Sequence, residues 1–206
     1  KTEAYVIPGF EDRRENIRKQ VIDTVAELGG EAVIDEDLLD EVAALNEWPV
    51  AVAGEFEEMF LEVPSEALIK TMQDNQKYFP VKDAAGGLKN YFITISNIDS
   101  KSPEKVKAGN ERVVRPRLAD AMFFWQQDQK QPLESFNEAL EKVVFQKKLG
   151  TIPDTQRLDE FPAESIAEHL GADLSLVSRA VTLSKCDLMT DMVGEFASLQ
   201  GVMGRR

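Results

Sequence analysis

The chain contains few of the residues from which many catalytic and metal sites are built. Its 206 residues include one cysteine, Cys186, and one histidine, His169. A lone cysteine cannot form an internal disulfide, and a zinc site or a serine–histidine–aspartate triad would lack its usual side chains. We therefore expect Cys186 to be a buried structural thiol and His169 to be a surface or helix-capping residue.

Long apolar runs are also missing. No run approaches the roughly 20 residues that span a bilayer, and the N-terminus lacks the basic and apolar regions of a signal peptide. Together with the single cysteine, these absences favour a soluble cytoplasmic protein without a membrane partner. The chain starts at Lys1 rather than at a methionine, and it stops at Arg206 directly after a predicted helix. We therefore expect an internal piece of a longer polypeptide.

Acidic residues outnumber basic ones, and the excess is uneven. The formal net charge is −13 at pH 7. Residues 1–100 hold 9 Lys and Arg against 21 Asp and Glu, residues 101–150 hold 10 against 7, and residues 151–206 hold 5 against 9. So acidic a chain repels nucleic acid at long range, and any RNA contact must be local. The sequence places such a contact in residues 101–150.

Hydrophobic patterns in residues 1–100 mix those of strands with those of helices. A helix is predicted from Glu11, where apolar residues recur at steps of three and four, and another after Asp35, whose side chain can cap it. Strands without a regular strand–helix–strand repeat favour an α+β domain with a mainly antiparallel sheet. The strands are predicted at 4–7, 32–34, 50–56, 78–81 and 91–95, with a third helix at 65–72.

Strand patterns stop after residue 100, and the remainder is predicted to be helical. Helices begin at Pro103 and at Pro116, because proline suits the first helical position. Further helices are predicted at 133–144, ending near Gly150, and at 166–170, 174–181 and 188–199. We therefore predict an α+β domain over residues 1–100, a basic helical connector over 101–150 and a helical part over 151–206.

The basic segment contains a cluster of arginines that runs into an aromatic helix. Guanidinium groups suit phosphate geometry, so this cluster and a nearby lysine pair are candidate RNA contacts. An intramolecular alternative is that the arginines pair with carboxylates of residues 1–100 and hold the helical segment on the α+β domain. The surplus of acidic residues favours this second interpretation. The candidate RNA contacts are Arg112, Arg115, Arg117, Lys147 and Lys148.

Other polar and aromatic clusters favour structural roles. Phe123, Phe124 and Trp125 follow helical spacing, which predicts core residues rather than base-stacking groups. The acidic runs at 35–37 and 55–58 are expected to be helix-start and surface charges. The basic face of the first predicted helix is expected to be solvated surface. No residue is predicted to be catalytic or to bind a metal.

Several motifs, taken together and in order, resemble one family. They occur along the whole chain, so the resemblance does not depend on a single segment. They are EWPV at 47–50, FLEVP at 60–64, QDNQKYFPV at 73–81, GNERVVRPRLADAMFFW at 109–125, FQKKLGT at 145–151 and LSKCDLMT at 183–190. In these motifs and their spacing, the chain resembles the β subunit of the bacterial heterotetrameric glycyl-tRNA synthetase.

The resemblance implies a division of labour between two subunits of an α2β2 complex. In that family the α subunit holds the class II active site that activates glycine with ATP and magnesium, while the β subunit supports recognition of tRNA(Gly). This chain is therefore expected to need no cofactor of its own and to be inactive alone. Its partners would then be the α subunit and tRNA(Gly), with the candidate arginines and lysines as tRNA contacts.

The resemblance also implies that residues 151–206 begin a helical domain like that of the HD phosphohydrolases. Metal hydrolysis there needs a histidine–aspartate pair, and the chain has no His-Asp dipeptide. No metal site can therefore be assigned to Lys185, Cys186, Asp187 or Asp191, and a phosphohydrolase is disfavoured. A remaining alternative is an architectural module that contacts the α subunit and makes no contact with RNA.

Overall fold

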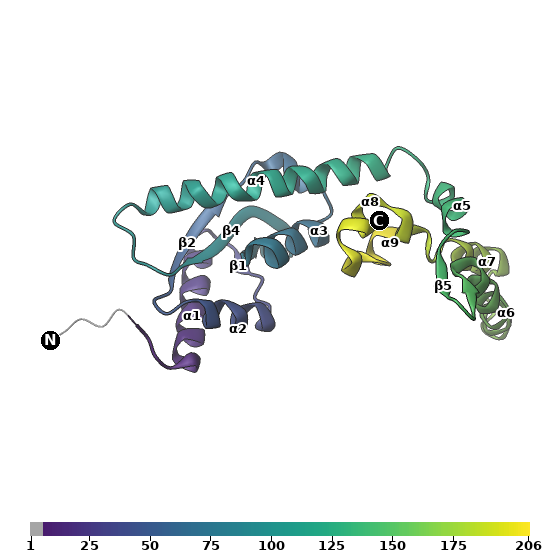
Figure 1. The fold of residues 1–206 in the computed structure, drawn as a ribbon, viewed down its shortest axis with the longest axis horizontal. Helices are drawn as coiled ribbons and strands as arrows, with labels where there is room; N and C mark the ends of the chain where they lie inside the picture. Colours follow the sequence, from purple (N-terminus) through teal and green to yellow (C-terminus); the bar gives the residue numbers. More distant parts are fainter. Residues whose placement is uncertain (1–5) are drawn as a thin grey trace. The chain divides into compact units, whose positions relative to one another are not determined.

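The computed structural model describes residues 6–206, which form two compact units (Figure 1). The first unit extends to Met122 and the second runs from Phe123 to Arg206. Residues 101–122 thus belong with the N-terminal sheet and its helices. The predicted division at residues 100 and 150 concerns independent folding and stays a prediction.

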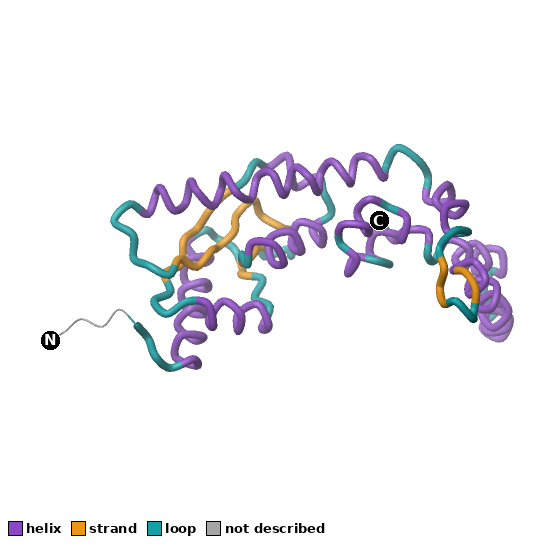
Figure 2. Tube along the Cα trace, in the orientation of Figure 1, coloured by secondary structure: helices purple, strands orange, loops and turns teal. Residues whose placement is uncertain are grey.

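The first unit combines one antiparallel sheet with helices, as Figure 2 shows in orange and purple. This confirms the predicted α+β class. Its elements are α1 (Phe10–Glu27), β1 (Glu31–Ala32), α2 (Glu36–Leu45), β2 (Val50–Glu55), a 3-10 turn (Glu58–Glu62), α3 (Ser65–Lys70), a π-helical turn (Thr71–Asn75), β3 (Phe79–Lys82), β4 (Leu88–Ser96) and α4 (Pro103–Asp128), the last of which continues into the second unit.

The sheet has the strand order β1-β3-β4-β2, and all its pairs are antiparallel. Strand β4 therefore lies inside the sheet, with Ile93 opposite both Phe79 of β3 and Ala53 of β2. Alternate residues of a strand face opposite sides of the sheet. Phe92 and Ile93 are both fully buried, so β4 is covered on both faces.

Helices α1 and α2 cover one face of this sheet. Ile17, Val21 and Val25 of α1 form one cluster with Leu39 of α2 and Ile93 of β4. The steps of four along α1 place these apolar side chains on a single helical stripe. Asp35 begins α2 as predicted, because its Oδ1 accepts a hydrogen bond from the Leu38 N–H at 3.0 Å.

Helix α4 lies on the side of the sheet opposite α1 and α2 (Figure 1). On that side Tyr78 stacks on Phe92 with ring centroids 4.5 Å apart, and its hydroxyl donates to Asn110 Oδ1 of α4 at 2.6 Å. Burial raises the pKa of Tyr78 to about 12. Gly54 lies opposite Phe92 in the register, and the absence of a side chain leaves room for the ring.

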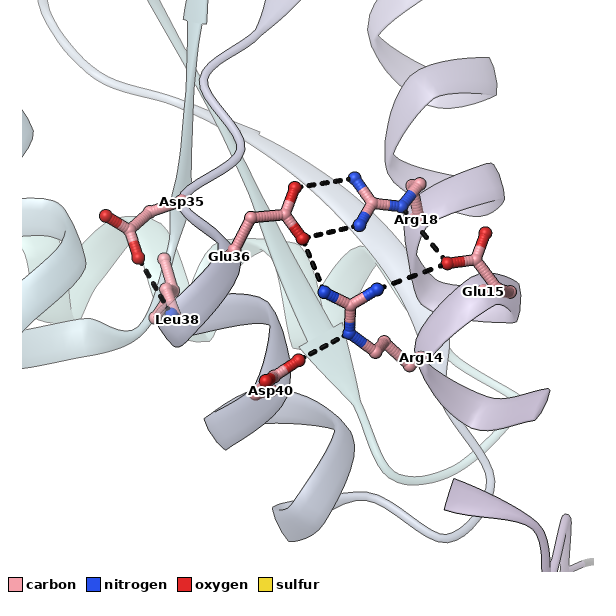
Figure 3. A network of polar contacts seen from close by, with 7 residues as sticks. All are labelled: Arg14, Glu15, Arg18, Asp35, Glu36, Leu38 and Asp40. Carbon is pink, nitrogen blue, oxygen red and sulfur yellow. Dashed lines mark hydrogen bonds and ion pairs between the residues drawn. The ribbon is translucent and has the colours of Figure 1, made fainter. Parts of the chain in front are cut away.

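An ion-pair network joins α1 to α2 on the surface (Figure 3). Arg18 binds Glu36 through two hydrogen bonds of 3.0 and 2.6 Å. Arg14 binds the same carboxylate and also Asp40. Hydrogen bonding to Arg18, with the nearby charges of both arginines, lowers the pKa of Glu36. The network therefore stabilises the helix pair while Glu36 is ionised.

The second unit consists of one long helix, α6, several shorter helices and a small hairpin. Its elements after the end of α4 are a 3-10 turn (Leu133–Phe136), α5 (Asn137–Leu140), β5 (Val144–Gln146), β6 (Gly150–Thr151), α6 (Ile152–Leu170), α7 (Leu174–Leu183), a 3-10 turn (Cys186–Met189), α8 (Asp191–Glu195), a 3-10 turn (Ala197–Leu199) and α9 (Val202–Arg205).

Three expectations from the sequence are wrong here. Pro116 does not begin a helix but lies inside α4, where buried Val114 and Leu118 on either side hold the helix across the missing N–H. Val144 belongs to strand β5, because Gly150 adopts a φ of +96° that closes a turn. Residues 188–199 form three short elements rather than one helix, because Thr190 and Phe196 adopt extended and irregular backbone angles.

Two other predicted strands also differ: one is shorter in the structure, and one lies partly outside the described residues. The strand expected at 32–34 is confined to Glu31–Ala32. Of the strand expected at 4–7, residues 4 and 5 lie outside the described part of the chain, and residues 6 and 7 are not in a strand.

Gly54→Ala is expected to lower the free energy of unfolding by about 1 to 3 kcal/mol, the usual cost of overpacking. The added methyl would lie 2.3 Å from Cζ of Phe92. Urea denaturation followed by circular dichroism measures the change. Gly109→Ala in α4 is the control, since its methyl meets nothing within 4 Å. The free energy of unfolding of Gly109→Ala should equal that of the parent or exceed it by up to about 1 kcal/mol. If Gly54→Ala were as stable as the parent, the close packing of Gly54 on Phe92 would be contradicted.

Glu36→Gln is expected to lower the melting temperature at pH 7 in low salt. Because the folded-state pKa of Glu36 is depressed, its contribution is present above the unfolded pKa of about 4.3 and is lost as pH falls through the folded pKa. The difference from the parent should therefore vanish in acid and shrink in 1 M salt. Glu27→Gln, an exposed acid of α1 without an ion pair among residues 6–206, is the control. A difference that persists in acid would refute the ionic origin.

Candidate functional site

The three arginines of α4 do not form one patch. Successive residues of an α-helix are rotated by about 100°, so Arg115 and Arg117 are separated by about 200° around the helix axis. Arg112 lies about 140° from Arg117 but only about 60° from Arg115. All three side chains are exposed. Arg112 and Arg115 therefore share one side of the helix, and Arg117 faces away from them.

Of the three arginines, only Arg115 pairs with a carboxylate of residues 1–100, as the intramolecular alternative predicts. Its Nε donates to Oε1 of Glu57 at 2.5 Å, and both side chains are about half exposed at 52% and 44%. Hydrogen bonding to its own backbone N–H and then to Arg115 lowers the pKa of Glu57. Within residues 6–206, Arg112 and Arg117 have no carboxylate partner. Both remain available to an external anion.

The lysine pair lies in the turn between β5 and β6. Lys147 and Lys148 are exposed, and neither has an ion pair in the part of the chain that the structure describes. Gln146 shapes the turn, because its side-chain oxygen accepts from Lys148 N–H at 3.2 Å and its carbonyl accepts from Leu149 N–H at 2.8 Å. The turn therefore presents both ammonium groups to solvent.

The base of this hairpin is fixed to α6. Asp154 accepts from both the backbone N–H and the hydroxyl of Thr151, at 2.8 and 2.9 Å, in a capping box at the start of the helix. These bonds, chiefly the one from the backbone N–H, lower the pKa of Asp154. Ile152 N–H also donates to the Val143 carbonyl at 2.9 Å. The hairpin is thus attached at its base to the long helix α6.

Phe145 of this hairpin was not recognised from the sequence as a functional candidate. It is 54% exposed, next to Val144 at 64% and close to Leu149 at 60%. An aromatic residue followed by two lysines and a glycine could have drawn attention to it. The helix expected over this region obscured the exposure, because helical spacing assigns such residues to a packed face.

The aromatic segment at the end of α4 is less buried than predicted. Phe123 is 55% exposed, so the expected core position is wrong for this residue. Phe124 and Trp125 are half-buried, and Phe124 makes an edge-to-face contact with Phe123 at 5.9 Å.

The lone histidine and the lone cysteine lie where the sequence placed them. His169 is exposed near the end of α6, with its Nδ1 2.8 Å from the Ser165 carbonyl. Cys186 is fully buried, and burial raises the pKa of its thiol. Both positions fit structural roles.

The acidic residues of the C-terminal helices serve as caps. Asp187 is buried, and its Oδ2 accepts from the Gly201 and Gly204 N–H groups at 2.5 and 3.1 Å. Asp128 accepts from the N–H groups of Asp191 and Met192 at 2.8 and 2.9 Å at the start of α8. Within residues 6–206, no group of three or more histidine, cysteine or carboxylate residues is placed to hold a metal ion.

The basic face of α1 is occupied by intramolecular partners. Arg14 and Arg18 bind the carboxylates of α2, and Arg13 donates to the backbone carbonyls of Ala43, Ile7 and Pro8. This face is therefore part of the fold. Across residues 6–206 no helix has both the length and the apolar character that crossing a membrane requires.

Comparison with known proteins gives a consistent result along the whole chain. A family model described as glycyl-tRNA synthetase beta subunit matches residues 1–206. The chain is 56% identical over 201 residues to the glycine–tRNA ligase beta subunit of Pseudomonas aeruginosa, 55% to that of Azotobacter vinelandii and 54% to that of Chromohalobacter salexigens.

Each of these alignments covers 98% of this chain and 29% of the relative, so the chain spans less than a third of the proteins that it matches. The match nevertheless includes both units and every motif on which the resemblance rests. Because the family model matches residues 1–206, the chain belongs to the glycyl-tRNA synthetase β subunit family.

Proposed function

We propose that this chain is the part of a glycine–tRNA ligase β subunit that helps to bind tRNA(Gly) during aminoacylation. In this proposal the α subunit of an α2β2 complex carries the class II chemistry, using ATP and magnesium to activate glycine. The complex works in the cytoplasm, where tRNA is charged for protein synthesis. Family membership over residues 1–206 is the observation that carries the proposal.

The distribution of partnered and unpartnered cations supports a role in tRNA binding. Before residue 100, most described basic side chains bind carboxylates or backbone carbonyls of the same unit. Cations that lack such a partner in the described residues concentrate between 101 and 148. They are Lys101, Lys105, Arg112, Arg117, Lys142, Lys147 and Lys148.

These side chains suit phosphate groups rather than bases. Arginine forms forked hydrogen bonds to phosphate, and lysine acts as a mobile point charge. Contacts of this kind position an RNA without reading its sequence. The long-range repulsion from a net charge of −13 then limits binding to the places where the cations gather.

A second candidate function is a contact with the α subunit. Helix α6 carries three large apolar side chains on one side that are 60% to 77% exposed, namely Leu158, Ile166 and Leu170. Exposed apolar stripes of this kind are typical of protein interfaces. This surface is compatible with tRNA binding elsewhere on the chain.

The intact complex should lose tRNA affinity when the unpartnered cations are removed. Arg112→Ala with Arg117→Ala, or Lys147→Ala with Lys148→Ala, should weaken binding and reduce the dependence of log Kd on log salt by about one for each lost phosphate contact. Melting temperature should stay unchanged, since no intramolecular ion pair is broken. Filter binding of tRNA at several salt concentrations measures both quantities.

Lys19→Ala is the control for these variants, because Lys19 is 75% exposed but paired with Asp23 in the first unit. It should leave the affinity and its salt dependence unchanged. Unaltered tRNA binding in both double variants would count against the proposal, and a fall in melting temperature instead would favour the structural role of the basic segment.

The isolated chain is expected to have no synthetase activity. Glycine-dependent exchange of pyrophosphate into ATP should stay at background with pure chain, because the proposal assigns this chemistry to the α subunit. The α subunit with full-length β serves as the positive control. Exchange above background that scales with the amount of pure chain would overturn the assignment.

A further inference from the structure

The hairpin tip between β5 and β6 combines exposed apolar and basic groups more closely than other surfaces of the second unit. Residues 142–150, KVVFQKKLG, contain three lysines and no acidic residue. All three residues of β5 are exposed. Phe145 is 54% exposed, and in the sequence it is within three residues of Lys142, Lys147 and Lys148.

The exposure of Phe145 is imposed by the hairpin. The hairpin has only two strands, and all three residues of β5 are exposed, so neither side of this strand is covered by a packed layer. The register shifts between the pair Val144 with Thr151 and the pair Gln146 with Gly150, so Phe145 lies at an irregularity of the ladder. Gly150 is required at its position because a Cβ there would lie 2.3 Å from Asp154 Oδ2, and its φ of +96° disfavours other residues.

Phe161 of α6 provides a comparison within the same unit. It is also strongly exposed, at 79%, but its neighbours in the sequence include Asp159, Glu160 and Glu164. Those carboxylates would repel a nucleic acid. The two phenylalanines therefore share exposure and side-chain type and differ in the sign of the charge around them.

We propose that Phe145 stacks on an unpaired base of the bound tRNA, while Lys147 and Lys148 contact the phosphates on either side of that nucleotide. This inference rests on the proposed function in tRNA binding. Aromatic side chains stack on any base, because every base has a π-face, and nearby cations hold the backbone. Bases inside a duplex are already stacked, so the nucleotide must be unpaired.

The test compares single variants of full-length β in the intact complex with the α subunit. Phe145→Ala should weaken tRNA binding by about 5- to 150-fold, which corresponds to the loss of one base-stacking contact. The slope of log Kd against log salt should stay unchanged, because no charge is removed. Phe161→Ala is the matched control and should leave Kd unchanged.

Phe145→Trp gives an independent readout that does not require loss of function. Indole preserves stacking, so Kd should stay within about threefold of the parent. Its fluorescence should fall when tRNA is added, beyond any change seen with the parent complex under the same conditions. No added quenching, in a variant that binds tRNA normally, would overturn the stacking contact.

The outcomes separate this inference from the proposed function. If Lys147→Ala with Lys148→Ala weakens binding but Phe145→Ala behaves like Phe161→Ala, stacking is refuted and tRNA binding by the chain stands. If neither the lysine pair nor the α4 arginines affect Kd, the proposed function itself fails. If Phe145→Ala leaves Kd unchanged but weakens assembly with the α subunit in sedimentation velocity, Phe145 is a protein contact and the inference is overturned.

Discussion

The excess of carboxylates determines which positive charges of this chain remain available to a partner. On the first unit, Glu36 binds two arginines of α1 and so ties α1 to α2. Arg115 of α4 likewise pairs with Glu57. The cations left without such a partner in the described residues include those that project from α4 and from the β5–β6 turn. In a chain of net charge −13, these are the places where a polyanion can approach.

Burial of β4 on both faces is the second constraint, because it requires a layer of helices on each side of the sheet. Phe92 and Ile93, adjacent in the sequence, are both fully buried on opposite sides. The requirement brings α4 against the sheet, where Asn110 accepts from Tyr78. The exposed side of α4 then carries Arg112 as a consequence of helical periodicity. Packing and the placement of the candidate site are thus linked through one helix.

The sequence predicted most of the first unit, because its signals are local and strong. The apolar steps of α1 and the cap at Asp35 each specify structure over a few residues. The errors arose where a tertiary contact overrides a local preference. Pro116 stays inside α4 because buried neighbours hold it, and the hairpin at 144–151 depends on a positive φ at Gly150 and on Asp154. The candidate cations were identified from the sequence, whereas their directions and the exposure of Phe145 required the structure.

Photo-cross-linking of tRNA that contains 4-thiouridine to the intact complex, with mass spectrometry of the linked peptides, tests most directly whether this chain contacts tRNA. The account predicts cross-links in the segment 142–150 or on α4 between Lys105 and Arg117. It predicts none on the face of α1 whose arginines bind Glu36. Cross-links confined to parts of the β subunit outside this chain, with none in residues 101–150, would contradict it.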